Sequence, residues 1–225
     1  MAKEPDPLDV PPCRTDDMRM AHGLFRSLFA DAPRLVRGVA AGDRDRAAIV
    51  ADHVLEVTAG LHRHHSGEDL LLWDALAERS PGCALHVGLM RTQHQEVSDL
   101  LDEVDESARA WRRTGSGVAR AELAERLDAV AAALLRHLGE EEEVILPAAA
   151  AVFSQREWNR LGEHGRAGIP RNRLFIQLGF ILSSMEPDAA RAFLAEMPPQ
   201  VRVLFRMLGR RQYLAHRRRV YGTAA

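Results

Sequence analysis

The sequence predicts an all-α protein, a four-helix up-and-down bundle with additional C-terminal helices. Apolar residues recur at the three- and four-residue spacing of helices, and few stretches alternate with the two-residue period of strands. Four long amphipathic segments follow one another with short glycine- or proline-containing breaks, which favours antiparallel neighbours in a bundle. We expect residues 1–14 to form a disordered proline-rich arm, residues 15–153 the bundle, and residues 154–225 a helical extension that packs on it.

Composition restricts the expected cellular setting. The chain has no run of about 18 apolar residues, so no membrane-spanning helix and no membrane partner are expected. Its first residues, MAKEPDPLDVPP, lack the apolar core of a signal peptide. Two cysteines, Cys13 and Cys83, are too few for a disulfide framework and fit a reducing compartment. We therefore expect a cytoplasmic protein.

Charge is unevenly distributed along the chain. Residues 1–153 contain 17 basic and 27 acidic residues, a balance of −10, and residues 154–225 contain 13 basic and 5 acidic, a balance of +8. A basic segment can indicate nucleic-acid or membrane contact. The stretch RRQYLAHRRRV has no recognisable nucleic-acid motif, so we expect no nucleic-acid partner. We favour a basic segment that docks on the acidic one or is solvated.

Caps and breaks predict where the four helices begin and end. Aspartates, which are good N-cap residues, precede the first two segments, and the breaks SPG and GSG precede the third and fourth. Pro33 is expected to kink or restart the first helix. The four helices are expected from about Asp16 to Gly42, Asp43 to Arg79, Cys83 to Val104 or beyond, and Ala121 to a kink or end at Pro147.

The second helix carries the stretch LHRHHSGEDLLLW. On a helix that advances about 100° per residue, His64 and Glu68 point about 40° apart, and Glu68 falls between His64 and His65. Two neutral imidazoles on either side of one carboxylate suit a metal pair with a bridging carboxylate. His53 lies about 16 Å from His64 along the helix, too far for the same metal, and is expected in the core or in the outer surroundings of the site.

The other helices each bring a histidine to their apolar face. His22 lies on or beside the buried face of the first helix, where a single histidine is more often hydrogen-bonded than a ligand. His94 falls on the buried stripe of the third helix, which is expected to include Leu85 and Leu89. In the fourth helix His137 and Glu141 repeat the four-residue spacing of His64 and Glu68.

These side chains together predict a metal site inside the bundle. Four-helix bundles build such sites from side chains that project inward from facing helices. Without a metal, the same groups would be scattered polar core residues with a large desolvation cost. The candidate metal ligands are His22, His64, His65, Glu68, His94, His137 and Glu141.

The pattern resembles the hemerythrin-like, or HHE cation-binding, domains over about residues 15–150. It consists of one histidine on the first helix, HHxxE on the second, one histidine on the third and HxxxE on the fourth. The resemblance implies a non-haem di-iron centre, with two irons per chain and an oxide or hydroxide bridge. By this resemblance His22 and His64 would bind one iron, His65, His94 and His137 would lie nearer the other, and Glu68 and Glu141 would bridge.

Two departures from the oxygen-carrying hemerythrins bear on function. Those proteins show HxxxH on the third helix, where this chain has Met90 in place of the first histidine, and HxxxxD on the fourth, where it has HxxxE. The additional His65 could replace the missing ligand. Simple oxygen transport is therefore in doubt. Imidazole and carboxylate ligands suit iron, with manganese or zinc as less favoured alternatives.

The sequence leaves three functions open. The favoured one is a di-iron protein that reacts with hydrogen peroxide, dioxygen or nitric oxide, with a catalase- or peroxidase-like role. The second is a non-catalytic binder or sensor of oxygen, nitric oxide or iron. The third is a helical interaction module with a structural metal. No catalytic residue beyond the ligands and no flavin or nicotinamide motif such as GxGxxG is evident, and the oligomeric state is left open.

The C-terminal segment has no second metal motif in the sequence. Ser154 is expected to cap a helix, and prolines separate the helices that follow. His164 and His216 are expected at the surface or in hydrogen bonds. We expect this extension to cover one face or end of the bundle and to limit access to the metals.

Overall fold

The computed structural model describes residues 12–222. Most of the expected arm, residues 1–14, lies outside the described residues. Cys13 and Arg14 at its end are described: the Cys13 side chain is buried, and its backbone N–H donates to the carbonyl of Ala150. The Arg14 N–H donates to the side chain of Gln155.

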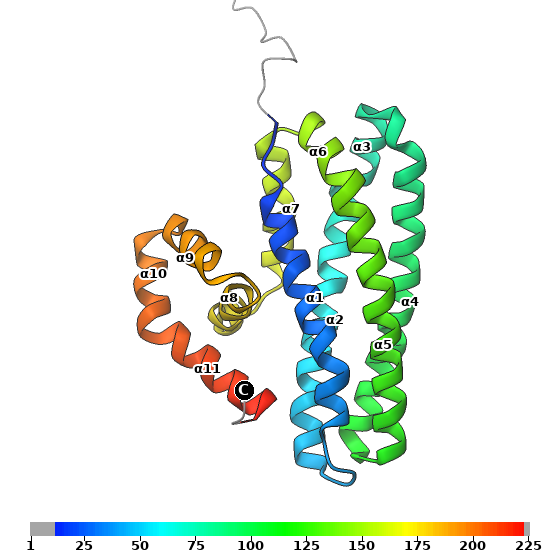
Figure 1. The fold of residues 1–225 in the computed structure, drawn as a ribbon, viewed down its shortest axis with the longest axis vertical. Helices are drawn as coiled ribbons and strands as arrows, with labels where there is room; N and C mark the ends of the chain where they lie inside the picture. Colours follow the sequence, from blue (N-terminus) through cyan, green and yellow to red (C-terminus); the bar gives the residue numbers. More distant parts are fainter. Residues whose placement is uncertain (1–11, 223–225) are drawn as a thin grey trace, which may run out of the picture.

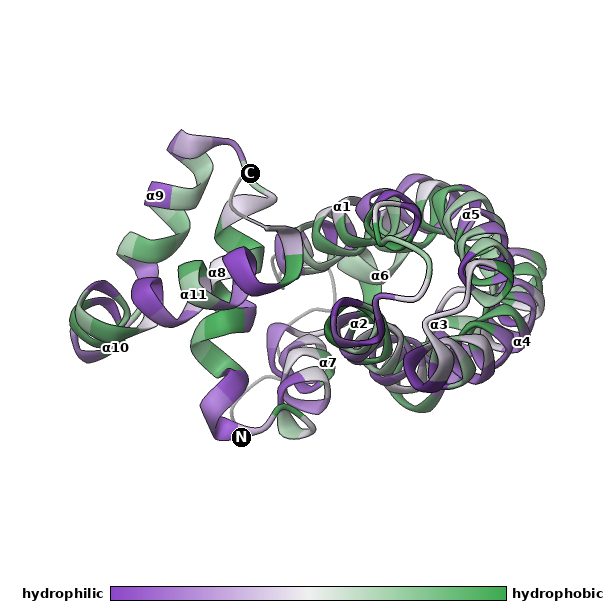
Figure 2. Ribbon diagram, turned by 90° about the horizontal axis from the view of Figure 1, so that it is seen from below, coloured by the Kyte–Doolittle hydropathy of each residue, from purple (hydrophilic) through white to green (hydrophobic). Residues whose placement is uncertain are grey.

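The predicted all-α bundle is confirmed. Four long helices run alternately down and up the molecule (Figure 1) and pack as a ring, α2 on α4, α4 on α5, α5 on α1 and α1 on α2. Seen end on, the ring stands to one side of the C-terminal helices (Figure 2). The ring is formed by α1 (Asp16–Arg37), α2 (Arg44–Leu71), α4 (Ala84–Thr114) and α5 (Gly117–Glu140).

Local sequence explains the ends of these helices. The Asp43 side chain accepts a hydrogen bond from the backbone of Arg46 and caps α2, and the Ser116 side chain caps α5. Gly115, with φ of 61°, adopts the left-handed conformation that ends α4 and is easy only for glycine. The helix α1 continues through Pro33, so the restart that was expected there as one alternative does not occur.

The second and third helices differ from the sequence expectation in two ways. The helix expected to reach Arg79 is interrupted at Leu72, after which α3 (Trp73–Arg79) and the 3₁₀ turn η2 (Pro81–Cys83) follow. Leu85 and Leu89 were expected to be buried, but they are 88% and 42% exposed. They lie in the first turns of α4, where the helical period continues but fewer neighbouring segments cover the helix.

A π-helical turn interrupts the fourth helix. The turn η3 (Glu141–Ile145) follows α5 directly and leads into α6 (Leu146–Val152), so Pro147 lies at the start of a new helix. A π turn contains one residue more than an α turn would need, and such turns often occur at functional sites. Here it begins at Glu141, a candidate metal ligand.

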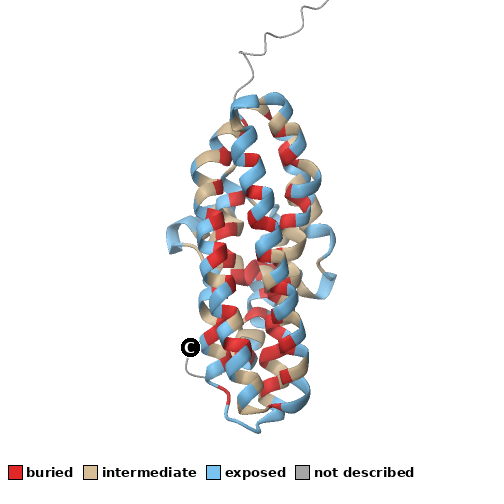
Figure 3. Ribbon diagram, turned by 90° about the vertical axis from the view of Figure 1, so that its right-hand side faces the viewer, coloured by how far each residue is buried: buried red, intermediate tan, exposed pale blue. Residues whose placement is uncertain are grey.

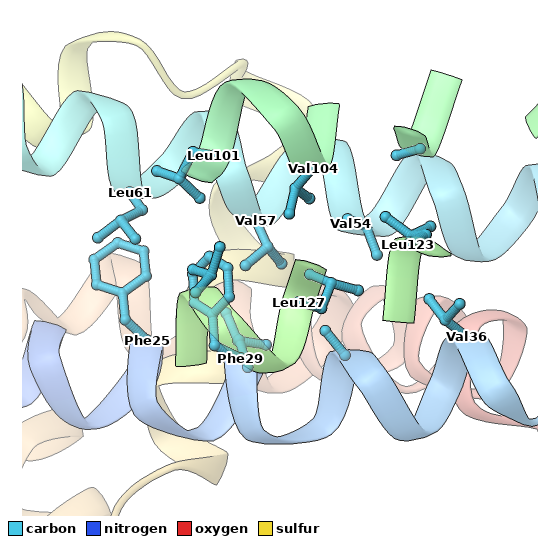
Figure 4. Packing of buried hydrophobic residues seen from close by; sticks show 14 of the residues in the cluster. Phe25, Phe29, Val36, Val54, Val57, Leu61, Leu101, Val104, Leu123 and Leu127 are labelled. Carbon is cyan, nitrogen blue, oxygen red and sulfur yellow. The ribbon is translucent and has the colours of Figure 1, made fainter. Parts of the chain in front are cut away.

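Two apolar clusters fill the bundle, and the candidate ligands lie between them. Along α1, Met18 belongs to one cluster, His22 follows, and Phe25 belongs to the other. The larger cluster includes Phe29, Val57, Leu101 and Leu127 from the four helices (Figure 4). Buried positions follow the inner faces along the length of the bundle (Figure 3). A single polar layer therefore separates two apolar cores.

The C-terminal segment is helical throughout most of its length. Its first helix packs along α2, and later helices contact α1 and α2. Ser154 and Glu157 form a reciprocal capping box at the start of the first of them. The helices are α7 (Gln155–Ala167), η4 (Arg171–Arg173), α8 (Leu174–Ser183), α9 (Pro187–Glu196), α10 (Pro199–Leu204), η5 (Phe205–Gly209) and α11 (Arg210–Tyr221).

Charged hydrogen bonds join this segment to the bundle. Arg173 donates to Glu56 of α2, with an Nε–Oε1 distance of 2.8 Å. Arg46 of α2 donates to the backbone carbonyls of Arg219 and Val220 at the end of α11. No helix within residues 12–222 is both long enough and apolar enough to cross a membrane.

Candidate metal centre

Side chains from four segments meet in the polar layer. The α1 helix contributes His22, α2 contributes three residues, α4 contributes His94, and the junction of α5 and η3 contributes His137 and Glu141. The side chains of His22, Glu68, His137 and Glu141 are completely buried. All seven residues that the sequence singles out are brought together here.

The two glutamates lie between histidines. Glu68 has Oε1 3.2 Å from His64 Nε2 and Oε2 3.4 Å from His94 Nε2. Glu141 Oε2 lies 3.4 Å from His22 Nε2 and 3.5 Å from His137 Nε2. Each carboxylate thus touches two histidines that come from different helices.

The contacting atoms are close without being hydrogen-bonded. Nine of them are buried and have no hydrogen-bond partner among residues 12–222: Nε2 of His22, His64, His65, His94 and His137, and both carboxylate oxygens of Glu68 and Glu141. Buried polar atoms without partners cost about 1–3 kcal/mol each. Two atoms about 2.1 Å from one metal ion, at angles of 90–109°, are about 3.0–3.4 Å apart. The spacing therefore fits donors that share metal ions.

The donors separate into two groups. His65, His94 and His137 lie with Glu68 in one set whose ligand atoms are within 4.8 Å of one another, and His22 and His64 lie with Glu68 in another. The ring of His65 stacks on that of His94, with centroids 4.2 Å apart. Glu68 belongs to both sets, so two metal ions with one shared carboxylate fit the arrangement.

Hydrogen bonds on the far side of three imidazoles fix their orientation. The Nδ1 of His22 lies 2.9 Å from Glu142 Oε1, that of His94 lies 2.7 Å from Asp69 Oδ1, and that of His137 lies 3.2 Å from Gln93 Oε1. When Nδ1 carries the proton and donates to these oxygens, Nε2 keeps a free lone pair directed into the cluster. The histidines are thus prepared as neutral ligands.

The surroundings of the cluster also favour neutral histidines. Burial, followed by the charges of neighbouring histidines, lowers the pKa of His64 and His65 well below the ordinary value and that of His137 to about 3. Burial raises the pKa of Glu68 and Glu141, since a lone carboxylate is poorly solvated there. Bound cations would remove this penalty, because metal ligands must be deprotonated.

The groups that hold the histidines from outside make further contacts of their own. Asp69 accepts a hydrogen bond from Trp73 Nε1 as well as from His94. Glu142 bonds both His22 and Arg26. Gln93 was not singled out, although its position directly before His94 was a usable signal.

The remaining histidines lie apart from the cluster. His53 is buried and faces Glu56 and His216, but the guanidinium of Arg173 bonds Glu56 and lies 3.4 Å from His216. A cation already occupies this second group, so it does not suit a metal ion. His164 bonds Ser66, as its expected hydrogen-bonded role requires, and His86 is exposed.

These features define a helical bundle with a buried histidine–glutamate cluster able to bind metal. A family model for the hemerythrin HHE cation-binding domain matches residues 13–149. The chain therefore belongs to the hemerythrin HHE cation-binding domain family, as its sequence pattern indicated. No match was found among curated proteins or among solved structures.

Proposed function

We propose that this protein holds two iron ions in the polar layer and reacts there with small oxygen species. The nine buried, unpartnered donor atoms carry the proposal, because two bound cations would satisfy all of them together. His22 and His64 would hold one iron. His65, His94 and His137 would hold the other, and Glu68 and Glu141 would bridge.

The unequal number of histidines supports a site for a small molecule. Two histidines serve one side and three the other, so the side of His22 and His64 has fewer protein donors. Iron bound by imidazole and carboxylate can bind hydrogen peroxide, dioxygen or nitric oxide and exchange electrons with them. The apolar clusters above and below limit water, and the outer hydrogen bonds hold the ligands in place.

A peroxide-decomposing role is favoured over simple oxygen carriage. In disproportionation two peroxide molecules give two water molecules and one dioxygen molecule, so the substrate supplies and accepts the electrons. That reaction fits a chain in which the sequence has no flavin or nicotinamide motif. Met90 occupies the position of a histidine ligand of the oxygen-carrying hemerythrins and is buried in the apolar cluster. This difference further distinguishes the site from that of the oxygen carriers.

Two other functions fit the same site. A non-catalytic protein would bind or sense oxygen, nitric oxide or iron without turnover. A helical interaction module would need the metal only for folding. Cytoplasmic location remains part of the proposal, supported by two free cysteines at residues 13 and 83.

Metal analysis of the purified chain is the first test. We expect about two irons per chain in protein loaded anaerobically with ferrous iron. Glu68→Ala and His137→Ala should lower this content, while His86→Ala, an exposed histidine on α4, should not. Oxygen release from peroxide by the loaded protein would then separate turnover from binding. Absence of bound metal in the wild type would refute the di-iron proposal.

A further inference from the structure

A large apolar cavity lies between the bundle and the C-terminal helices. Its volume is about 650 Å³, and its walls come from α1 and α2 on one side and from α7 to α10 on the other. In Figure 1, α8 to α10 stand to the left of α1 and α2, and α7, which packs on α2, lies beside them. Side chains that represent its apolar wall are Phe25, Leu28, Leu178, Phe180, Ile181 and Phe193.

The size of the cavity exceeds what the proposed small substrates require. A water molecule occupies about 30 Å³ in the liquid, and peroxide has only two heavy atoms. Sites for organic ligands measure roughly 300–1,000 Å³ and are mostly apolar with a few placed polar groups. By its volume and its apolar wall the cavity resembles the sites for organic ligands, although His64 and Glu68 also line it.

The wall of the cavity also contains arginines without an ion-pair partner in the described part of the chain. Arg63, Arg166 and Arg171 contribute to its wall, and their side chains form no ion pair or hydrogen bond within residues 12–222. The Nε atom of Arg63 is itself buried and without a partner there. The Arg63 side chain fills the space that a Cβ on Gly168 would need, so it lies against the link between the other two arginines.

The carboxylates that line the cavity are already engaged. Glu56 accepts hydrogen bonds from Arg173 and from Gln177. Asp17 accepts one from Trp158 Nε1 at 2.8 Å, and Glu68 belongs to the metal cluster. None of these carboxylates forms an ion pair or hydrogen bond with Arg63, Arg166 or Arg171.

We propose that this cavity binds a single-chain amphiphile with a carboxylate head, such as a fatty acid. The apolar wall takes the hydrocarbon chain, and the carboxylate pairs with the arginines around Arg63. A carboxylate accepts charge-assisted hydrogen bonds from guanidinium groups, and these arginines have no ion-pair partner among residues 12–222. This inference goes beyond the proposed function and does not rest on it, because the binding requires no metal.

Dodecanoate tests the proposal by isothermal titration calorimetry on the full-length protein, below the concentration at which it forms micelles. We expect saturable binding of about one molecule per chain, and at least tenfold weaker binding of dodecan-1-ol, which has the same chain and no charge. Arg63→Met keeps the aliphatic stem, removes the charge and should weaken dodecanoate by at least tenfold. Arg109→Met, at an exposed arginine paired with Asp105 and outside the cavity wall, is the control.

A second pair of variants tests the cavity itself. Gly165 lines the cavity, and a Cβ there meets no atom within 4 Å, so the backbone tolerates a side chain and the ring of Gly165→Phe is expected to fill part of the space. Gly165→Phe should abolish binding and Gly165→Ala should retain it. Equal binding of dodecanoate and dodecan-1-ol, or no effect of Arg63→Met, would overturn the anionic site. Absence of saturable binding would overturn the proposal that the cavity binds such an amphiphile. Metal content measured on the same samples reports separately on the iron site.

Discussion

Single hydrogen bonds outside the cluster decide how its histidines are presented. Asp69 is about half exposed, yet its Oδ1 lies 2.7 Å from His94 Nδ1 and accepts from Trp73 as well. Burial raises the pKa of Asp69, but the hydrogen bond and charge of His94 outweigh it, so the net pKa is lowered. An ionised Asp69 thus holds the proton of His94 on Nδ1.

Asp69→Asn should weaken the metal site. The amide is a poorer acceptor than the carboxylate, and outer partners of this kind typically change metal affinity by about 10–100-fold. Titration of metal-free protein with ferrous iron measures the change. Asp74→Asn is the matched control, because Asp74 is exposed and pairs only with Arg91 among residues 12–222. Equal affinities of the two variants would contradict a role for Asp69 in holding His94.

At the scale of elements, the π turn sets the position of Glu141 relative to α6. The turn places Glu141 and Ile145 on the buried side. The Glu141 carboxylate reaches the polar layer, and the Ile145 side chain packs in the apolar cluster. An α-helical turn would need one residue fewer for the same rise to the next layer. The turn therefore accommodates one extra residue directly at the ligand Glu141.

Deletion of Glu143 should remove this adjustment. Glu143 is exposed, so its side chain is dispensable, but without it the π turn should close as a regular α turn and shift the Glu141 carboxylate relative to His22 and His137. We expect a lower unfolding temperature and loss of at least one metal per chain. Glu143→Ala keeps the chain length and should retain both properties. Metal content and thermal unfolding of the two variants provide the comparison, and an intact site in the deletion variant would refute this role of the turn.

The sequence predicted the elements better than their interruptions. The sequence shows helical periodicity directly, because it is a local pattern. The same holds for the four-residue spacing of His64 with Glu68 and of His137 with Glu141. The interruption at Leu72 and the π turn at Glu141 depend on packing among three helices, which no local pattern records. Exposure of Leu85 has the same cause, since amphipathic spacing gives the face of a helix but not whether a neighbour covers it.

At the scale of the whole molecule, the extension is attached through Glu56 and Arg173. The cavity beneath it could not be predicted from the sequence, because its walls come from two distant stretches of the chain, residues 17–68 and residues 161–201. Burial raises the pKa of Glu56, but the hydrogen bond and charge of Arg173 outweigh it and bring the pKa below the ordinary 4.5. A depressed pKa in the folded state means that this stabilisation is present at neutral pH and is lost as pH falls through that lower value.

Glu56→Gln should therefore weaken the attachment of the extension at neutral pH. In acid the attachment should weaken less in the variant than in the wild type, because the variant has already lost this ion pair. The pair is about one-quarter exposed, so we expect a loss of about 1–2 kcal/mol, between exposed and buried pairs. Hydrogen exchange of α8 amides measures the change at pH 7 and below pH 4.5. Glu103→Gln, at an exposed pair with Arg126 inside the bundle, is the control. Unchanged exchange in Glu56→Gln at neutral pH would show that apolar contacts alone hold the extension.

Removal of metal should destabilise the whole bundle, because the polar layer lies across all four helices between the two apolar clusters. Free metal at 100 times its dissociation constant adds about 2.7 kcal/mol to stability, which corresponds to an unfolding temperature about 5–11 °C higher for a chain of this size. We expect a chelator to lower the unfolding temperature of the loaded protein by this amount and added ferrous iron to restore it.

Glu68→Gln, which replaces the carboxylate shared by both donor sets with a neutral group of the same shape, should remove most of the difference in unfolding temperature between the metal-loaded and the metal-free protein. It should also make the metal-free bundle no less stable than the wild type, since burial of the neutral amide costs less than burial of a carboxylate. Identical unfolding with and without chelator would mean that the nine unpartnered atoms are satisfied by water, and the di-iron proposal would then fail at its central observation.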